Sequence, residues 1–318
     1  MFGRVLGILL CLTGAAPAAL AQSRAFEFVA MGDMPYTPED YAKVDHLIDA
    51  INARKPALVI HVGDIISGRA ECSDENLTRS ARQLERIEAP LIYTPGDNEW
   101  TDCHRPLGGR FDPLERLVKL RSLMFPSPGR SLGKAPVAVE AQSLVMPEFA
   151  EFHENIRFEH NGVHFATAHV VGSNNNYDPS RPATVDEFSR RNRANLAWIE
   201  RTFQQAIKAD AKALVIAWQG NVHPRRQSAT SQMAFGDIVE AIDQGAHRFK
   251  RPLLVIYGDE HTFDIARFNG ASGKPSPGAF KLMVFGDRQV HAVRVSVDPD
   301  MPGVFGFTPL IVPANGLP

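Results

Sequence analysis

The sequence lacks the features that mark membrane, nucleic-acid-binding and repetitive proteins. Beyond its N-terminus it has no uninterrupted apolar run of about 20 residues, so no membrane span is expected. Its 34 Lys and Arg residues are balanced by 36 Asp and Glu residues and form no dense block, which gives no nucleic-acid-binding signature. No fixed-period repeat or low-complexity tract is present. A near-neutral chain of 318 residues is typical of one large α/β domain or of two smaller domains.

Cysteine is also scarce, with three residues in the whole chain. Cys11 lies in a stretch that predicts a secretory signal, because Arg4 supplies a positive charge, residues 5–13 are apolar and Ala21 ends a small-x-small cleavage site. Leu10 precedes Cys11 where a lipoprotein signal needs a small residue, so no lipid anchor is expected. We predict a signal peptide over residues 1–21 and a soluble protein that is periplasmic or secreted.

The two remaining cysteines are Cys72 and Cys103. In an oxidising export compartment, two cysteines most simply form one disulfide. Each of them follows a Gly-Asp pair at the end of a strand-like run. A bridge between them would therefore tie together two loops that are candidates for the functional site.

Apolar runs alternate with segments of helical periodicity along most of the chain. Strands are predicted near residues 26–31, 58–62, 91–93, 163–171, 213–217 and 253–257, and helices near 41–51, 77–87, 114–124, 188–207 and 233–246. Near-continuous apolar strands joined by helices indicate a parallel sheet covered on both faces. Residues 282–285 and 290–297 flank Gly286, Asp287 and Arg288, which predicts a hairpin. We expect one domain over residues 22–318 with a loop excursion near 125–155.

The most informative feature is a Gly-Asp pair at the end of four strand-like runs. Ligands of open α/β sheets bind outside the carboxyl ends of the strands, where these acids are expected to converge. Each pair alone is a common turn dipeptide, but four at strand ends are hard to explain as turns. Converging carboxylates repel one another unless a cation compensates them. The four pairs are Gly32-Asp33, Gly63-Asp64, Gly96-Asp97 and Gly258-Asp259.

Two of these clusters carry further polar side chains. After Asp97 come the amide Asn98, the carboxylate Glu99 and Trp100, for which we favour a core position. His261 follows Asp259 by two residues, so both side chains point the same way if the backbone stays extended. A carboxylate with an imidazole suits Zn, Fe or Mn better than Ca.

The order G-D, G-D, G-[ND]-x-E, a polar strand end and then G-x-x-H resembles the calcineurin-like metallophosphoesterases, from residue 26 to about 297. The resemblance implies a β-sandwich flanked by helices, a four-layer αββα architecture. It also implies two divalent cations, of Mn, Fe, Zn or Mg, and hydrolysis of phosphate mono- or diesters by a metal-bound hydroxide. Asp64 would be the bridging carboxylate. The metal ligands carried over are Asp33, Asp64, Asp97, Asp259 and His261.

Several positions depart from the family pattern. Pro35 stands where members often have His, and Gln219 stands where the fourth motif has its His. Asn98 takes the place of the His that usually contacts the phosphate and serves the leaving group, and an amide cannot protonate an alkoxide. Oxygen ligands in place of imidazoles make the site harder, which favours Mn or Mg.

The general acid and the substrate contacts are less sharply indicated. His104 is the first candidate for the acid and His223 the second, although an ordinary surface position is the more common one for a single histidine. His61 and His169 lie within apolar runs and are expected in the core, and Arg190, Arg191 and Arg193 are expected on a solvated helix face. The candidates for substrate binding are Tyr36, Asn175, Gln219 and Asn221.

Three hypotheses follow from these observations. The leading one is an exported, metal-dependent phosphoesterase that acts on a phosphorylated small molecule or diester. The alternative is a degenerate member that binds metal or a phosphorylated ligand without turnover, because three expected imidazoles are absent. A substrate-binding protein of two α/β lobes is the third, but it leaves the strand-end acids unexplained.

Overall fold

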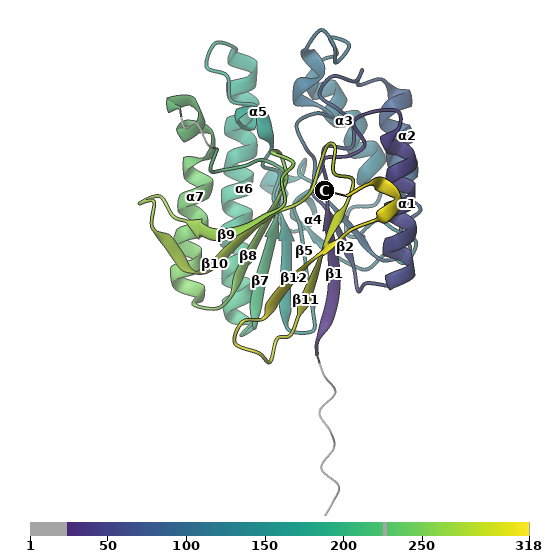
Figure 1. Ribbon diagram of the computed structural model, residues 1–318. Helices are drawn as coiled ribbons and strands as arrows, with labels where there is room; N and C mark the ends of the chain where they lie inside the picture. The colour runs from purple at the N-terminus through teal and green to yellow at the C-terminus, as the bar shows by residue number, and fades with distance from the viewer. Residues whose placement is uncertain (1–23, 225–227, 318) are drawn as a thin grey trace, which may run out of the picture.

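Four layers build the protein, two β-sheets packed face to face with helices on both outer faces (Figure 1). The structure is a computed structural model that describes residues 24–224 and 228–317. The predicted signal peptide, residues 1–21, lies outside the described residues. Within the described part, no helix is both long and apolar enough to cross a membrane. The two packed sheets with helices on both outer faces confirm the αββα architecture expected from the resemblance.

The first sheet has the strand order β12-β11-β1-β2-β3. Strands β1, β2 and β3 run parallel, whereas β11 is antiparallel to both β1 and β12. Three helices, α1, α2 and α3, cover its outer face (Figure 1). The bounds are β1 Phe26–Met31, α1 Asp40–Arg54, β2 Val59–His61, α2 Asp74–Leu84, β3 Leu91–Tyr93, the 3-10 helix η1 Thr101–His104, α3 Pro113–Met124, β11 Ala292–Val297, β12 Phe305–Leu310 and the 3-10 helix η3 Pro313–Asn315.

The second sheet has the order β4-β5-β6-β7-β8-β10-β9. Its central strands β6, β7, β8 and β10 are parallel, and the long helices α6 and α7 cover its outer face (Figure 1). The bounds are β4 Glu140–Ala141, α4 Gln142–Val145, the 3-10 helix η2 Pro147–Phe149, β5 Ile156–His160, β6 Val163–Thr167, α5 Gly172–Asn175, α6 Pro182–Lys208, β7 Ala213–Ala217, α7 Ala229–Phe249, β8 Leu253–Tyr257, β9 Asp264–Asn269 and β10 Pro275–Met283.

Successive side chains of a strand point to opposite faces of its sheet, so some apolar side chains face the other sheet and others face the helices. Phe28 and Ile60 face the second sheet, whereas Val29 and Val59 pack against the helices of the first. In the second sheet, Val215 faces inward and Leu214 faces α6 and α7. Every strand of the centre is therefore buried on both sides, which explains the near-continuous apolar runs in the sequence.

Two expectations from the sequence are wrong at the level of topology. The single parallel sheet is in fact two mixed sheets. The hairpin around Gly286 and Asp287 does not form, because β10 belongs to the seven-stranded sheet and β11 to the five-stranded one. A Gly-Asp connection shows where the chain turns, but not whether it returns to the same sheet. Here it carries the chain from one sheet to the other.

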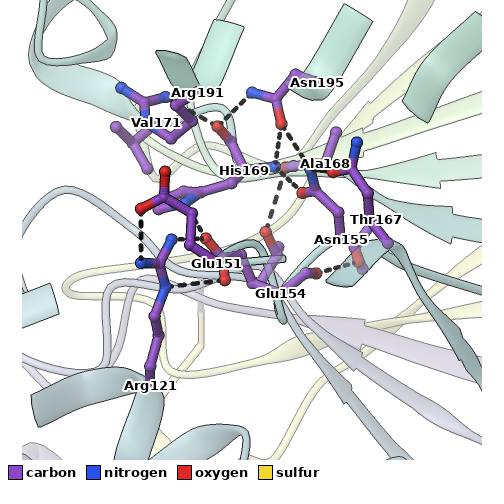
Figure 2. Close-up of polar contacts among 12 residues, drawn as sticks. Arg121, Glu151, Glu154, Asn155, Thr167, Ala168, His169, Val171, Arg191 and Asn195 are labelled. Carbon is purple, nitrogen blue, oxygen red and sulfur yellow. Dashed lines mark hydrogen bonds and ion pairs between the residues drawn. The ribbon is translucent and has the colours of Figure 1, made fainter. Parts of the chain in front are cut away.

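A buried polar network lies beneath the loop that follows β6 (Figure 2). His169 Nδ1 lies 2.7 Å from Glu154 Oε1, and Arg121 donates to the same carboxylate. Burial alone would raise the pKa of Glu154, but Arg121 and His169 outweigh it and hold this pKa below its usual range. Arg191 donates to the His169 carbonyl and is fully buried, so its expected place on a solvated face is wrong. His61 and His169 lie in the core as expected.

Candidate metal centre

The four acids of the Gly-Asp pairs come from both sheets, and Asp33, Asp64 and Asp97 are buried whereas Asp259 is partly buried. Asp33, Asp64 and Asp97 follow β1, β2 and β3 of the first sheet, and Asp259 follows β8 of the second. The carboxyl ends of these two sets of parallel strands meet at one end of the sandwich, which brings the acids together. Asp64, Asp97 and Asp259 line a common cleft of ≈ 560 Å³, and Asp33 lies beneath it with no exposed surface.

The glycines of two pairs lack a side chain where the carboxylate of another pair lies. A Cβ on Gly258 would lie 1.9 Å from Asp33 Oδ2, and a Cβ on Gly96 would lie 2.0 Å from Asp64 Oδ1. The tight turn of these pairs is made largely by the acids, since Asp33, Asp64 and Asp259 have φ values of 54°, 55° and 77°. Left-handed backbone of this kind is costly outside glycine and clusters at functional sites.

Asp64 is held by two residues that the sequence had already marked. Tyr36 Oη donates to Asp64 Oδ2 over 2.7 Å, and Asn98 Nδ2 donates to the same oxygen over 2.8 Å. The Asn98 backbone N–H donates to Asp64 Oδ1 over 3.1 Å, and Asn98 Nδ2 also donates to Tyr36 Oη over 2.8 Å. Both hydrogens of the Asn98 amide are thus in use, and the orientation of Asp64 is fixed.

His261 completes a compact set of ligand atoms with the first two acids. Ligand atoms of Asp33, Asp64 and His261 all lie within 4.8 Å of one another, and His261 Nε2 is 3.7 Å from Asp33 Oδ1. The extended backbone expected between Asp259 and His261 is wrong, because their φ values are 77° and 58°. The turn still brings both residues to the cleft.

A second cluster, which the sequence did not indicate, adjoins Asp97. Ser173 Oγ lies 2.5 Å from Asp97 Oδ2 and 3.1 Å from Asp102 Oδ2, so its single proton is shared between two carboxylates. Arg105 donates to Ser173 Oγ over 3.1 Å and forms an ion pair with Asp102. The only sequence signal for Ser173 was its position in a polar strand end.

Glu99 fixes the loop between the second and third acids. Its Oε1 accepts hydrogen bonds from the Asp64 N–H at 3.1 Å, the Gly96 N–H at 2.7 Å and the Tyr93 hydroxyl at 2.5 Å. Burial raises the pKa of Glu99, while the hydrogen bonds from Tyr93 and Gly96 act against the rise. Glu99 is therefore a positioning residue beneath the cleft.

The four acids of the Gly-Asp pairs concentrate negative charge at one place. Burial raises the pKa values of Asp33 and Asp64 well above their usual range, and repulsion from neighbouring carboxylates adds to this. Burial together with Asp97 raises the pKa of Asp259 to about 7. Among the described residues, no Lys or Arg forms an ion pair with any of the four acids of the Gly-Asp pairs.

The residues present fit a divalent cation. Asp33 Oδ2 is buried and has no hydrogen-bond partner among the described residues, which leaves a carboxylate oxygen free as a ligand. Buried charge of this density is stable only when it is paired or coordinates a metal. Carboxylate oxygens with one imidazole nitrogen suit Mn, Fe, Zn or Mg.

Comparison with known proteins identifies the family. A profile described as calcineurin-like phosphoesterase matches residues 26–263. The chain belongs to this family. The fold is similar to that of PhoD, with a TM-score of 0.57 and 12% identity over 92% of this chain and 70% of that one. It is also similar to purple acid phosphatase PPD1 from seeds of yellow lupin, Lupinus luteus, with a TM-score of 0.52 and 12% identity.

The lupin comparison covers 92% of this chain and 55% of that one, so the chain spans about half the length of the lupin protein. Likeness at 12% identity shows the fold alone. No curated protein sequence matches the chain. As a calcineurin-like phosphoesterase, the protein is a metal-dependent hydrolase of phosphate esters, and divalent metal is its cofactor.

The remaining candidate residues of this calcineurin-like phosphoesterase lie at different distances from the acids. Gln219 is buried beside them and accepts from the Gly172 N–H over 2.6 Å, and the Asn221 N–H donates to Asp259 Oδ2 over 2.9 Å. Asn175 does not line the cleft, because it is fully buried and accepts from Arg191. His223 does not line it either, since its Nε2 bonds to the Asn269 carbonyl. His104 lines an adjoining pocket.

Two connections frame the cleft of the calcineurin-like phosphoesterase. The expected disulfide is present, and Cys72–Cys103 joins the loop after β2 to helix η1 after β3. The crossing between the sheets is the part that sequence reasoning missed, because Asp287 and Arg288 line the cleft rather than a hairpin turn. A Cβ on Gly286 would lie 2.7 Å from Asp33 Cβ, so this crossing passes directly over the first acid.

Proposed function

We propose that the protein hydrolyses phosphate mono- or diesters with two divalent cations in the cleft. The observation that carries the proposal is the convergence of four carboxylates at the strand ends of two sheets. Three of them are buried, and none forms an ion pair with a Lys or Arg of the described residues. Asp33, Asp64 and His261 would hold one ion, and Asp97 and Asp259 would complete the second site with Asp64 between them. Bound cations supply an activated water and neutralise charge on the phosphoryl oxygens.

The residues of the chain orient the ligands and the substrate. Tyr36 and Asn98 hold Asp64, so Asn98 acts through this carboxylate more than through a direct phosphate contact. The Asn221 N–H holds Asp259 in the same way. Arg69, Arg105 and Arg288 also line the cleft, and a guanidinium is suited to binding phosphate oxygens.

His104 is the proton donor that we assign to the leaving alkoxide. Its Nδ1 lies 2.6 Å from the Thr101 carbonyl, so Nδ1 carries a hydrogen and Nε2 is the nitrogen left for proton transfer. The ring lines a pocket that shares Asp102, Arg105 and Ser173 with the cleft. The disulfide supports action in an oxidising compartment outside the cytoplasm, as the predicted signal peptide requires.

The test is a metal and activity assay on the mature chain from Gln22. Bound metals are determined by elemental analysis, and 4-nitrophenyl phosphate and bis(4-nitrophenyl) phosphate are assayed with added Mn, Fe, Zn or Mg. Asp64→Asn should lower turnover at least ~1,000-fold, because a neutral amide is a poor bridging ligand. Asp186→Asn, an exposed residue on α6, is the matched control and should retain activity.

Two outcomes would contradict the proposal. No turnover with any metal, despite bound metal, would favour the alternative of a protein that binds metal or a phosphorylated ligand without hydrolysis. Full activity of Asp64→Asn would show that the site lies elsewhere.

A further inference from the structure

A second cavity of ≈ 380 Å³ adjoins the metal cleft. It lies between helix η1 and the loop after β6, and Thr230 at the start of α7 closes another side. Asp102, Arg105 and Ser173 line both cavities, so these residues form a shared wall. A ligand held at the metal centre could therefore extend past Ser173 into the second cavity, which is large enough for a small organic group.

The loop that carries this wall has an unusual backbone. Ser173, Asn174, Asn175 and Asn176 have successive φ values of 48°, 53°, 53° and 58°, which makes a left-handed turn of four residues. Left-handed backbone costs about 1–2 kcal/mol for each such residue, and such residues normally occur singly. A turn of this kind persists only where its surroundings determine it completely.

The surroundings that hold the turn are buried and charged. Arg191 donates to Asn175 Oδ1 over 2.5 Å and to the Asn175 carbonyl over 2.8 Å. Its partner Glu187 accepts from Asn176 Nδ2 over 2.8 Å, so one ion pair holds two residues of the turn. Arg191 also donates to the His169 carbonyl, which links the turn to the network in Figure 2. The wall is therefore rigid, and Ser173 is fixed between the two cavities.

The lining of the second cavity is polar and its charges are already compensated. Every lining residue except Pro179 has a polar side chain. Arg105 pairs with Asp102, and Arg181 pairs with Asp178 over 2.7 Å. The exposed side chain of Asn174 makes no hydrogen bond to any described residue, and His104 Nε2 is likewise unpartnered there. The cavity thus offers donors and acceptors to a neutral ligand rather than charge to a second anion.

We infer that this cavity, the alcohol subsite, receives the leaving group of the phosphate ester and selects a neutral, hydroxyl-rich alcohol such as a polyol or a sugar. The inference rests on the proposed function, since the phosphate must be held at the metal centre for its alcohol to reach Ser173 and Asn174. Hydroxyl groups of the alcohol would bond to Asn174 and to other polar side chains of the lining. An apolar alcohol would leave these groups unpaired, which costs affinity.

The probes are two primary alkyl phosphates with a six-membered ring, glucose 6-phosphate and cyclohexylmethyl phosphate. They are assayed on the mature, metal-loaded protein, and selectivity is the ratio of their kcat/KM values. We expect glucose 6-phosphate to be favoured at least ~10-fold, which corresponds to ~1.4 kcal/mol. Asn174→Gly keeps the left-handed backbone but removes the amide, and it should lower the ratio about 5-fold, mainly through KM.

A second variant tests the same cavity from its other side. Thr230→Trp fills the cavity from α7 and leaves all four residues of the left-handed turn unchanged, and it should bring the ratio close to one. Asp186→Asn should keep the wild-type ratio. Circular dichroism and metal content establish that each variant is folded and loaded.

The results separate failure of this inference from failure of the proposed function. Equal kcat/KM values for the two probes, or a wild-type ratio in both Asn174→Gly and Thr230→Trp, would overturn the alcohol subsite. Absence of turnover of 4-nitrophenyl phosphate by the loaded wild-type protein would instead overturn the proposed function on which the subsite depends.

Discussion

A single methyl group at Gly258 should disable the metal centre without removing any ligand. The Cβ of Gly258→Ala would lie 1.9 Å from Asp33 Oδ2 and 2.8 Å from Asp33 Cγ. To restore even a tight contact of 3.0 Å, the carboxylate oxygen must retreat by about 1.1 Å. Metal ligands tolerate displacements of about 0.2 Å, so Asp33 would no longer be in place.

The magnitude follows from the loss of one positioned ligand. Loss of residues that merely orient ligands typically costs 10–100-fold in metal affinity, so we expect at least ~100-fold for Gly258→Ala, or ~2.7 kcal/mol. At a metal concentration 100 times the wild-type Kd, bound metal stabilises the wild-type protein by ~2.7 kcal/mol. The same concentration should stabilise the variant by only ~0.4 kcal/mol.

Thermal unfolding with and without Mn measures this difference. The metal should raise the Tm of the wild-type protein by roughly 5–10 °C and that of Gly258→Ala by roughly 1 °C. Only the metal-dependent shift is compared, because the overlap also lowers the stability of the metal-free variant.

Gly236→Ala is the matched control for this experiment. Gly236 lies on α7, and no atom would lie within 4 Å of its added Cβ. Alanine should stabilise this helix by ~0.5–1 kcal/mol and leave the metal-dependent shift unchanged. A wild-type metal shift in Gly258→Ala would refute the reasoning, since it would mean that Asp33 is not a ligand.

The remaining predictions concern the disulfide and pH. Reduction of Cys72–Cys103, which closes a separation of 31 residues, should lower the free energy of unfolding by ~3–4 kcal/mol, and an unchanged denaturation midpoint would contradict this. Metal-free protein should lose stability as pH rises from about 4 through about 7, because folded Asp33, Asp64 and Asp259 keep protons that the unfolded chain has released. Denaturation midpoints at pH 5 and pH 8 measure this loss, and a higher midpoint at pH 8 would be the contrary result.

Local patterns in the sequence predicted the strands that end at the four acids and several of the helices. Strand β1 has the predicted bounds because Phe26–Met31 is an apolar run that ends at a glycine. Helix α1 was recognisable from Val44, Leu47, Ile48 and Ile51, which are buried at helical spacing. Asp33, Asp64, Asp97 and Asp259 were marked because a Gly-Asp pair at a strand end is itself a local signal. Asp33, Asp64 and Asp97 are buried, and Asp259 lines the same cleft as Asp64 and Asp97, which agrees with the convergence expected from strand direction.

The features that were missed depend on contacts between distant segments. Strands β10 and β11 do not pair with each other, because β10 pairs with β8 and β9, whereas β11 pairs with β1 and β12. No residue near Asp287 indicates this pairing. Arg191 was placed in solvent because its neighbours are charged, yet Glu187 and Asn175 offer it a buried site that only the fold assembles. Ser173 gave no sign of its contact with Asp97, because its left-handed turn is imposed from outside.

The origin of the ligands in both sheets makes the metal centre a property of their docking. Strands of the five-stranded sheet are followed by Asp33, Asp64 and Asp97, and a strand of the seven-stranded sheet is followed by Asp259 and His261. Neither sheet alone therefore contains the complete set of ligands. A cation there would bind ligands from both sheets at one end of the sandwich. Any shift of one sheet relative to the other would therefore change the distances between its ligands. Metal occupancy would accordingly report whether the two sheets are packed in their native positions.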